Sequence, residues 1–229
     1  MPAQRRHDLP AISDPQPLGS QIYERLLREL LSIDIEPGAR LSVDALSRRY
    51  ETSPTPVREA LGRLEAEGLV IRHHLRGYRA TERLTHAEIG AMFDFRDQLE
   101  PFAAARAALL RTEDQVSELR SLATQMNATA HRAGAKLAYG DFAELDAQLH
   151  GLIAVMSGNA LIQDALSTTH AHMHYFRLRR DRTVALDALD EHAVIVEAIA
   201  RGDRYVAEGA MRSHLVRSRS RLLGGQDPQ

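Results

Sequence analysis

The stretch SPTPVREALGRLEAEGLV, residues 53–70, decides the fold of the first part of this 229-residue chain. Ser53 can cap a helix, and Pro54 then occupies the first helical position, where proline is favoured. The apolar residues that follow recur at helical spacing: Val57, Ala60, Leu61 and Leu64. Gly68 ends the pattern. The stretch therefore predicts one amphipathic helix with a clear start and a clear end.

Two further helical patterns precede this stretch. The first begins at Ser20, which can serve as its N-cap, and Glu36–Gly38 ends it as a turn. Its apolar residues are Ile22, Leu26, Leu27, Leu30 and Leu31. The second, shorter helix begins at Ser42. Residues 1–17 contain four prolines and no periodicity, and they predict a flexible arm.

A short hairpin is predicted directly after the third helix. Leu69–Ile71 and Tyr78–Ala80 are β-prone runs, and a turn around Arg76 and Gly77 joins them. Three helices and a hairpin within residues 18–80 have the order of a winged helix-turn-helix, whose third helix enters the DNA major groove. Arginine suits this task because its fork of donors matches phosphates and guanine edges.

The charge of the chain is unevenly distributed. The net charge is −2 at pH 7, which argues against a generally basic nucleic-acid binder. Residues 37–80 nevertheless contain eight arginines and five acidic residues, a local excess of three positive charges. The alternative for this segment is a solvated face, on which Arg63 and Glu67 form an ordinary pair one helical turn apart.

The composition changes after Ala80, and the remaining sequence is almost entirely helical. Thr85–Glu88 has the form of a capping box, in which two side chains satisfy the first backbone donors of a helix. Helix breaks are expected near Thr112, near Gly140, at Gly158-Asn159, around Asp181–Thr183 and at Gly202-Asp203. The sequence therefore predicts a mainly α protein. A linker covers residues 81–87, an all-α bundle of about six helices covers 88–223, and a frayed tail covers 224–229.

Composition excludes several classes of protein. There is no apolar run of 18 residues or more, so no helix is expected to cross a membrane. The first residues lack the apolar segment of a secretory signal. The chain has no cysteine, which excludes disulfides and thiolate metal sites and favours a cytoplasmic protein.

Four side chains of the helical part can form a metal site. Asp146 and His150 are four residues apart, so both lie on one helix face. His192 and His214 each fall on the apolar side of a later helix. One carboxylate and three imidazoles are a donor set suited to Zn, Ni, Mn, Co or Fe. The alternative is that each histidine is a hydrogen-bonded core residue and that Asp146 pairs with an arginine.

Arg96 lies on the apolar stripe of the first helix of this part, and a buried arginine needs an anionic partner. One candidate partner is Glu100, four residues on. The other is the carboxylate of a small molecule, held by two parallel hydrogen bonds. Three other histidines form a separate group that can bind metal or remain solvated: His170, His172 and His174.

The segment IEPGARLSVDALSRRYETSPTPVREALGRLEAEGLV, residues 35–70, resembles the DNA-binding domain of GntR-family bacterial repressors. The resemblance implies that five residues contact DNA: Arg49, Ser53, Thr55, Arg58 and Gly77. Arg58 is then the best candidate for reading a base, and Gly77 lies in the wing, which enters the minor groove. Many relatives have arginine at the position of Pro54, so the resemblance implies a partly different base contact here.

The helical part resembles the FCD ligand-binding domain of the FadR subfamily over about residues 88–222. The pattern comprises Phe95-Arg96, Leu99-Glu100, Asp146-x-x-x-His150, Ser157-Gly158-Asn159, Glu191-His192, Ala198-Ile199-x-x-Gly202-Asp203 and His214. About six helices, rather than seven, indicates the VanR-like branch. The resemblance implies that Asp146 and the three histidines hold a divalent metal beneath an effector cavity. It also favours a small organic acid as the ligand of Arg96, with Tyr175 and Arg177 as further contacts.

Together these patterns predict a cytoplasmic, homodimeric transcription regulator and not an enzyme. The resemblance favours a repressor that its ligand releases from DNA, which is the commoner outcome in this family. Two winged domains would read an inverted repeat of double-stranded operator DNA. An organic acid in the helical domain would change DNA affinity through the linker near Thr81–Thr85. One alternative is a regulator that responds to the metal ion itself. A metal-dependent enzyme is disfavoured because Glu191 points about 100° away from His192 around the helix and supplies no general base.

Overall fold

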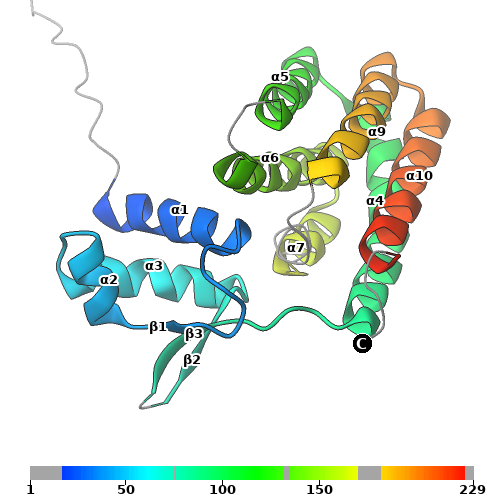
Figure 1. Ribbon diagram of the computed structural model, residues 1–229. Helices are drawn as coiled ribbons and strands as arrows, with labels where there is room; N and C mark the ends of the chain where they lie inside the picture. The colour runs from blue at the N-terminus through cyan, green and yellow to red at the C-terminus, as the bar shows by residue number, and fades with distance from the viewer. Residues whose placement is uncertain (1–16, 75, 132–134, 170–181, 225–229) are drawn as a thin grey trace, which may run out of the picture.

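The computed structural model describes residues 17–74, 76–131, 135–169 and 182–224 (Figure 1). The candidates Tyr175, Arg177, His170, His172 and His174 lie outside these residues, as do nearly all of the predicted arm and tail. Within the described ranges the chain is mainly helical, with one small sheet in the N-terminal part, and the predicted mainly α fold is confirmed. None of these helices is long and apolar enough to cross a membrane.

Three helices form the N-terminal part: α1 (Leu18–Leu31), α2 (Val43–Arg49) and α3 (Pro54–Ala66). α3 begins where the sequence predicts, with Ser53 as its N-cap. Ser42 caps α2 by accepting a hydrogen bond from a backbone N–H of its first turn. α1 begins two residues before Ser20, because the Pro17 carbonyl accepts the first backbone hydrogen bonds. The core of this part includes Leu26, Leu30, Leu31, Leu61, Leu64 and Leu69.

An antiparallel sheet of three strands completes the N-terminal part: β1 (Arg40–Leu41), β2 (Val70–His73) and β3 (Gly77–Ala80), in the order β1-β3-β2. The predicted hairpin is confirmed as β2 and β3. β1 was not predicted, because two residues are too few to show the alternation of a strand. Leu41 and Tyr78 face the core, whereas their neighbours Arg40 and Arg79 are exposed.

Six helices make up the described residues of the C-terminal part. They are α4 (His86–Leu110), α5 (Glu113–Ala130), α6 (Ala135–Met156), α7 (Ala160–Thr169), α9 (Arg182–Arg201) and α10 (Arg204–Leu223). α4 begins at the capping box predicted for Thr85 and Glu88, and both of its hydrogen bonds are formed. Thr112 caps α5 and Asp203 caps α10.

The predicted helix break near Gly140 is wrong. α6 runs through Gly140, and the preceding helix ends earlier, at Ala130. A glycine inside a helix disfavours it by only about 1 kcal/mol relative to alanine. Burying Phe142 and Leu149, which follow on the same helix and are fully enclosed, contributes about 1.5–3 kcal/mol each and outweighs that loss.

α4 is central to the C-terminal part, where it packs against α6, α9 and α10 (Figure 1). Two ion pairs, Arg212 to Asp97 at 2.8 Å and Arg219 to Asp94 at 2.6 Å, join α10 to α4. The core between these helices includes Ile89, Phe93, Leu119, Met126, Phe142, Ile153, Ile195, Ile199 and Met211.

The two parts of the molecule are in contact through α1 and α6 (Figure 1). Ala143 of α6 is fully buried, and it belongs to the same apolar cluster as Ile22, Tyr23 and Leu26 of α1. α6 therefore belongs to the helical bundle and also supports the first helix of the winged unit.

Candidate nucleic-acid interface and metal centre

The N-terminal half of α3 presents polar side chains to solvent. Ser53, Thr55 and Arg58 are all exposed, while Val57 and Ala60 of the same helix are buried. Ser53 has extended backbone angles, and its side chain makes no capping hydrogen bond, which leaves the hydroxyl available. Within the described residues, Arg58 has no carboxylate partner. Three of the five residues predicted to contact DNA are therefore accessible on one short segment.

A groove of about 770 Å³ separates α3 from the β2–β3 hairpin. Its lining includes Thr55 and Arg58 from α3, together with Arg72 and Gly77 from the hairpin. The backbone of Gly77 has a φ of 81°, a conformation that favours glycine and turns the chain into β3. The structure thus places the predicted wing residue beside the predicted reading residue.

Other arginines of the winged part have internal partners. Arg49, the fifth predicted DNA contact, donates a hydrogen bond of 2.9 Å to Glu29. Arg63 lies 3.8 Å above the centre of the Tyr23 ring, and the Tyr23 hydroxyl donates to Glu67 at 2.7 Å. The Arg63–Glu67 pair considered from the sequence is thus mediated by Tyr23, and these contacts hold α1 against α3.

In the C-terminal part, three of the four predicted metal ligands converge. His150 of α6, His192 of α9 and His214 of α10 are buried, and each offers one ring nitrogen within 4.8 Å of the others. The Nε2 atoms of His150 and His192 are 3.4 Å apart. Asp146 also lies beside this group, because its Oδ1 is 3.2 Å from Nε2 of His192.

Glu100 and Arg96 support His150 from α4. His150 donates from Nδ1 to Glu100 Oε2 at 2.6 Å, so its Nε2 faces the other histidines as an acceptor. Arg96 donates from Nε and Nη2 to the two oxygens of Glu100, and both side chains are 3% exposed. Of the two partners considered for Arg96, the protein itself supplies Glu100.

Glu191 and Arg221 support His214 in the same way. His214 donates from Nδ1 to Glu191 Oε2 at 2.8 Å. Arg221 donates to the two Glu191 oxygens at 2.7 and 2.8 Å. Burial raises the pKa of Glu191, but the hydrogen bonds from Arg221 and His214 outweigh burial and lower the pKa to about 2. Glu191 is therefore an ionised acceptor at neutral pH.

Sequence reasoning missed this role of Glu191, which it considered only as a general base. Its partners lie 23 and 30 residues further along the chain, on a different helix. The only local signal was its position directly before His192. That position correctly indicates that Glu191 points away from the cluster centre, but it does not reveal which side chains it meets.

His192 differs from the other two histidines. Its Nδ1 is buried and has no hydrogen-bond partner within the described part of the chain. Burial lowers the pKa of His192 well below its ordinary value, and the neighbouring His214 lowers it further, while Asp146 opposes the shift. The ring is therefore neutral, which is the form that binds metal ions.

This arrangement fits a divalent transition metal. Three imidazoles direct nitrogens to one buried point, a carboxylate lies beside them, and two carboxylates hold the outer nitrogens of two rings. Histidines that bind metals usually donate their second ring N–H to such a carboxylate. Core histidines that hydrogen-bonded only to one another would not need these two carboxylate partners.

Known protein families match the N-terminal and C-terminal parts of the chain separately. Residues 18–80 match the gntR family of bacterial regulatory proteins, and residues 91–217 match the FCD domain. The HTH-type transcriptional repressor RspR of Escherichia coli K12 is 29% identical over 206 residues, covering 89% of this chain and 88% of RspR. The HTH-type transcriptional regulator LutR of Bacillus subtilis is 27% identical over 214 residues, covering 83% and 94%.

Solved structures show the same fold. E. coli McbR/YncC superimposes with a TM-score of 0.71 at 18% identity, covering 92% of this chain and 99% of the other. A putative GntR transcriptional regulator from Rhodococcus sp. RHA1 gives 0.69 at 19% identity, covering 91% and 99%. Because the FCD match spans more than half of the chain and the gntR match covers the winged unit before it, the protein belongs to the GntR family of bacterial regulatory proteins, as a DNA-binding transcriptional regulator with an FCD domain and not an enzyme.

Proposed function

We propose that this protein is a homodimeric repressor whose affinity for an inverted-repeat operator is controlled by a small organic acid bound beside a metal ion. The observation that carries the proposal is the buried cluster of His150, His192 and His214 with its two supporting carboxylates. We place the protein in the VanR-like branch of the FadR subfamily.

Asp146 and the three histidines would hold the ion, which can be Zn, Ni, Mn, Co or Fe. When bound, the ion would supply a positive charge that attracts the carboxylate of an effector. Glu100 and Glu191 would keep the His150 and His214 rings in the orientation that binds it. The donor set does not discriminate among these ions, because imidazole and carboxylate suit all of them.

The effector contact predicted for Arg96 takes a specific form in this structure. Arg96 is 2% exposed, and its guanidinium is bound to Glu100. An effector carboxylate could recruit Arg96 only by competing with Glu100, which would in turn release His150. Effector binding and metal coordination would then be coupled through these three side chains.

α6 offers a route from the site to the winged unit. It carries Asp146 and His150, and its Ala143, one turn before Asp146, is buried against α1. A ligand that moves or fixes α6 would therefore change the support of α1, in addition to acting through the linker at Thr81–Thr85. Such a ligand changes DNA affinity only if it binds the two arrangements unequally.

Exposed apolar side chains favour a homodimer through α4, α6 and α7. They are Phe102, Leu109, Leu110, Val155 and Leu161, and Leu161 is 79% exposed. The three helices contact one another, and Leu110 lies against Gly158 in the turn between α6 and α7. Water-exposed apolar groups gathered in this way are typical of an interface.

A second candidate is direct response to the metal. It is favoured by the donor set itself, because three histidines and Asp146 can hold an ion without any organic ligand. The two proposals differ in one observation, namely whether DNA affinity follows the metal concentration alone.

The experiment begins with selection of bound sequences from random duplex DNA, which should yield an inverted repeat. Operator affinity is then measured by fluorescence anisotropy for chelated protein, for Zn²⁺- or Mn²⁺-loaded protein, and for loaded protein with a panel of small carboxylic acids. We expect a carboxylic acid to weaken binding only in the loaded protein. His192→Ala should lose this response and keep its DNA affinity; equal loss of both would contradict effector control.

A further inference from the structure

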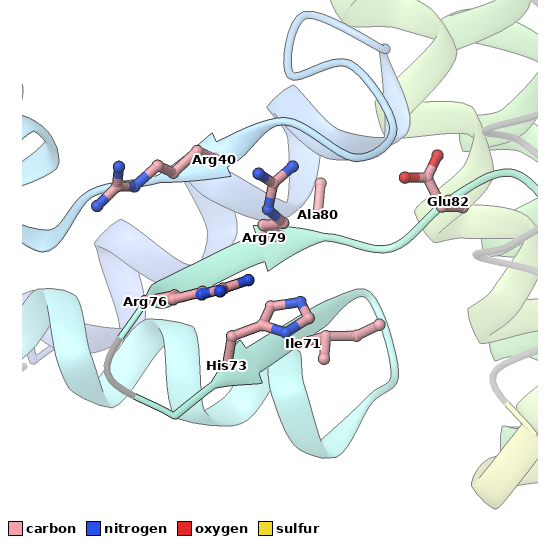
Figure 2. Close-up of a pocket in the computed structure, with 7 residues that line it drawn as sticks. All are labelled: Arg40, Ile71, His73, Arg76, Arg79, Ala80 and Glu82. Atoms are coloured by element: carbon pink, nitrogen blue, oxygen red, sulfur yellow. The ribbon is translucent and has the colours of Figure 1, made fainter.

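The last two turns of α4 carry two arginines that bind other helices. Arginines of the winged part such as Arg40, Arg76 and Arg79 are exposed around its sheet (Figure 2). Arg106 and Arg111 of α4 are instead half-buried, and both donate hydrogen bonds to backbone carbonyls at helix ends. These two side chains therefore join elements of the helical part to α4.

Arg106 holds the C-terminal end of α6. Its Nε donates to the Ser157 carbonyl at 2.6 Å, and Ser157 is fully buried, so this carbonyl depends on a donor from the protein. Gly158 turns the chain here with a φ of 65°, and a methyl group of Leu110 lies 3.0 Å from the point where a Cβ of residue 158 would be. The Ser157-Gly158-Asn159 motif of the sequence is thus a turn that α4 contacts.

Arg111 holds the C-terminal end of α9. Its Nε donates to the Ala200 carbonyl at 3.0 Å, and its Nη1 donates to the Ala108 carbonyl of α4 itself at 2.7 Å. One guanidinium therefore joins the ends of two helices. It occupies the place where a Cβ of residue 202 would lie, so Gly202 makes room for it. The Gly202-Asp203 motif is the second turn that α4 contacts.

The two helices held in this way carry candidate metal ligands. On α6, Ser157 lies seven residues, or about two turns, after His150. On α9, Ala200 lies eight residues after His192. α4 also reaches His150 directly, through Glu100. α6 is therefore held on α4 at two points, and a shift of α6 along α4 would separate His150 from Glu100.

We propose that Arg106 and Arg111 are positioning residues for the histidine cluster. Arg106 fixes α6 on α4 and so keeps His150 against Glu100, while Arg111 fixes α9 and so places His192. A cation is suited to this task because the last carbonyls of a helix lack partners within it and carry partial negative charge. Metal sites tolerate only small displacements of their ligands. The part of this inference that concerns metal rests on the proposed function.

The test uses the full-length chain with Arg106→Gln or Arg111→Gln, and Co²⁺ alone as the probe. Competition with a fluorescent chelator gives the Co²⁺ affinity, and the visible absorption spectrum of the bound ion reports its coordination. Ile162→Val is the control for a modest loss of stability, because Ile162 is buried on α7, whose described residues include no candidate ligand. Arg201→Gln, at a side chain that is 79% exposed, is the control for loss of one charge. Urea unfolding of the metal-free proteins ranks their stabilities.

We expect each glutamine variant to bind Co²⁺ about tenfold more weakly and with an altered spectrum. This is the low end of the effect of groups that orient metal ligands, because the arginines act on the helices and not on the rings. Ile162→Val and Arg201→Gln should bind Co²⁺ as wild type. Arg106→Lys keeps a cation for the Ser157 carbonyl and should restore most of the affinity. Wild-type affinity and spectra in both glutamine variants would overturn the proposal.

A measurement without metal separates this inference from the proposed function. Nitrogen-15 NMR of the histidine rings reports the hydrogen bond from His150 Nδ1 to Glu100 in the metal-free protein. Arg106→Gln should shift this signal, and Ile162→Val should not. A wild-type chain that bound no Co²⁺ would overturn the metal site alone, whereas an unshifted His150 signal in Arg106→Gln would overturn the positioning role.

Discussion

Arginine has opposite roles in the two parts of this molecule. In the winged part, Arg58 and Arg76 are exposed and, within the described residues, have no carboxylate partner. In the helical part, Arg96 and Arg221 are buried or nearly so, and each holds both oxygens of a glutamate. Exposed charges are screened by salt and remain available to a partner, whereas buried pairs are screened much less and are already engaged.

The difference teaches how to separate binding residues from supporting ones. A buried ion pair adds little net stability when it is formed, but removing one partner leaves an uncompensated charge in the core. An exposed arginine can be removed with almost no effect on folding. Stability and DNA affinity should therefore respond to different arginines.

The largest effect is expected for Arg96→Ala. Removal of the guanidinium leaves Glu100 buried beside His150 without its cation, which should lower the free energy of unfolding by about 3–5 kcal/mol. Urea unfolding followed by circular dichroism measures the loss. Arg58→Ala is the control and should stay within about 0.5 kcal/mol of wild type. Equal stabilities for the two variants would remove the distinction drawn between these arginines.

The next effect concerns DNA reading by Arg58. Arg58→Ala should weaken operator binding by about 10- to 100-fold, because a lost base contact costs about 1–3 kcal/mol. Scrambled DNA should be affected much less. Arg63→Ala is the matched control on the same helix, since Arg63 packs on Tyr23 and serves the domain core. If Arg63→Ala lost specificity and Arg58→Ala did not, the reading face of α3 would be wrongly assigned.

A similar or smaller effect is expected for the carboxylates that support the histidines. Glu100→Gln and Glu191→Gln should each weaken metal binding by about 10- to 100-fold, because the donor that orients a ligating ring loses its charged acceptor. Competition with a fluorescent chelator measures the affinity. Glu113→Gln, at an exposed position at the start of α5, should bind metal as wild type. Unaltered metal affinity in both buried variants would mean that these carboxylates serve the core alone.

The smallest expected effect concerns Tyr50, which shares the partner Glu29 with Arg49, an exposed but paired arginine. Burial and, after it, the neighbouring Glu29, which also binds Arg49, raise the pKa of Tyr50 from 10 to about 12. A raised pKa favours the neutral phenol, so its contribution to stability is complete below pH 10 and is lost as the pH rises towards 12. In an absorbance titration, the phenolate signal of Tyr50 should appear only above pH 11. The Tyr50→Phe variant lacks this signal and so identifies it. A signal near pH 10 would contradict the Glu29 contact.

Local signals explain why much of the fold could be predicted. A cap, a proline and a glycine sit within a few residues of the ends of α3, and a capping box marks the start of α4. Non-local effects account for the errors. β1 exists because Arg40 and Leu41 pair with a strand almost 40 residues away, and α6 continues through Gly140 because the helix buries apolar groups beyond it.

In the candidate site, too, local patterns could be predicted and contacts between distant helices could not. Asp146 and His150 could be placed on one helix face from their spacing, His192 and His214 were candidates because each falls on the apolar side of a later helix, and the resemblance joined all four into one site. The identity of the partner of Arg96 could not be decided from the sequence, since an internal glutamate and a ligand carboxylate present the same chemistry. The Glu191–Arg221 pair could not be predicted either, because it depends on how α9 crosses α10.

Native mass spectrometry of untagged protein, purified without metal-affinity resin, tests the central claim most directly. We predict a dimer with one divalent ion per chain and a small additional mass from an organic acid, and loss of both masses in His192→Ala. A wild-type dimer with the mass of two bare chains would contradict metal-linked effector control, and it would reduce Asp146 and the three histidines to residues of the core.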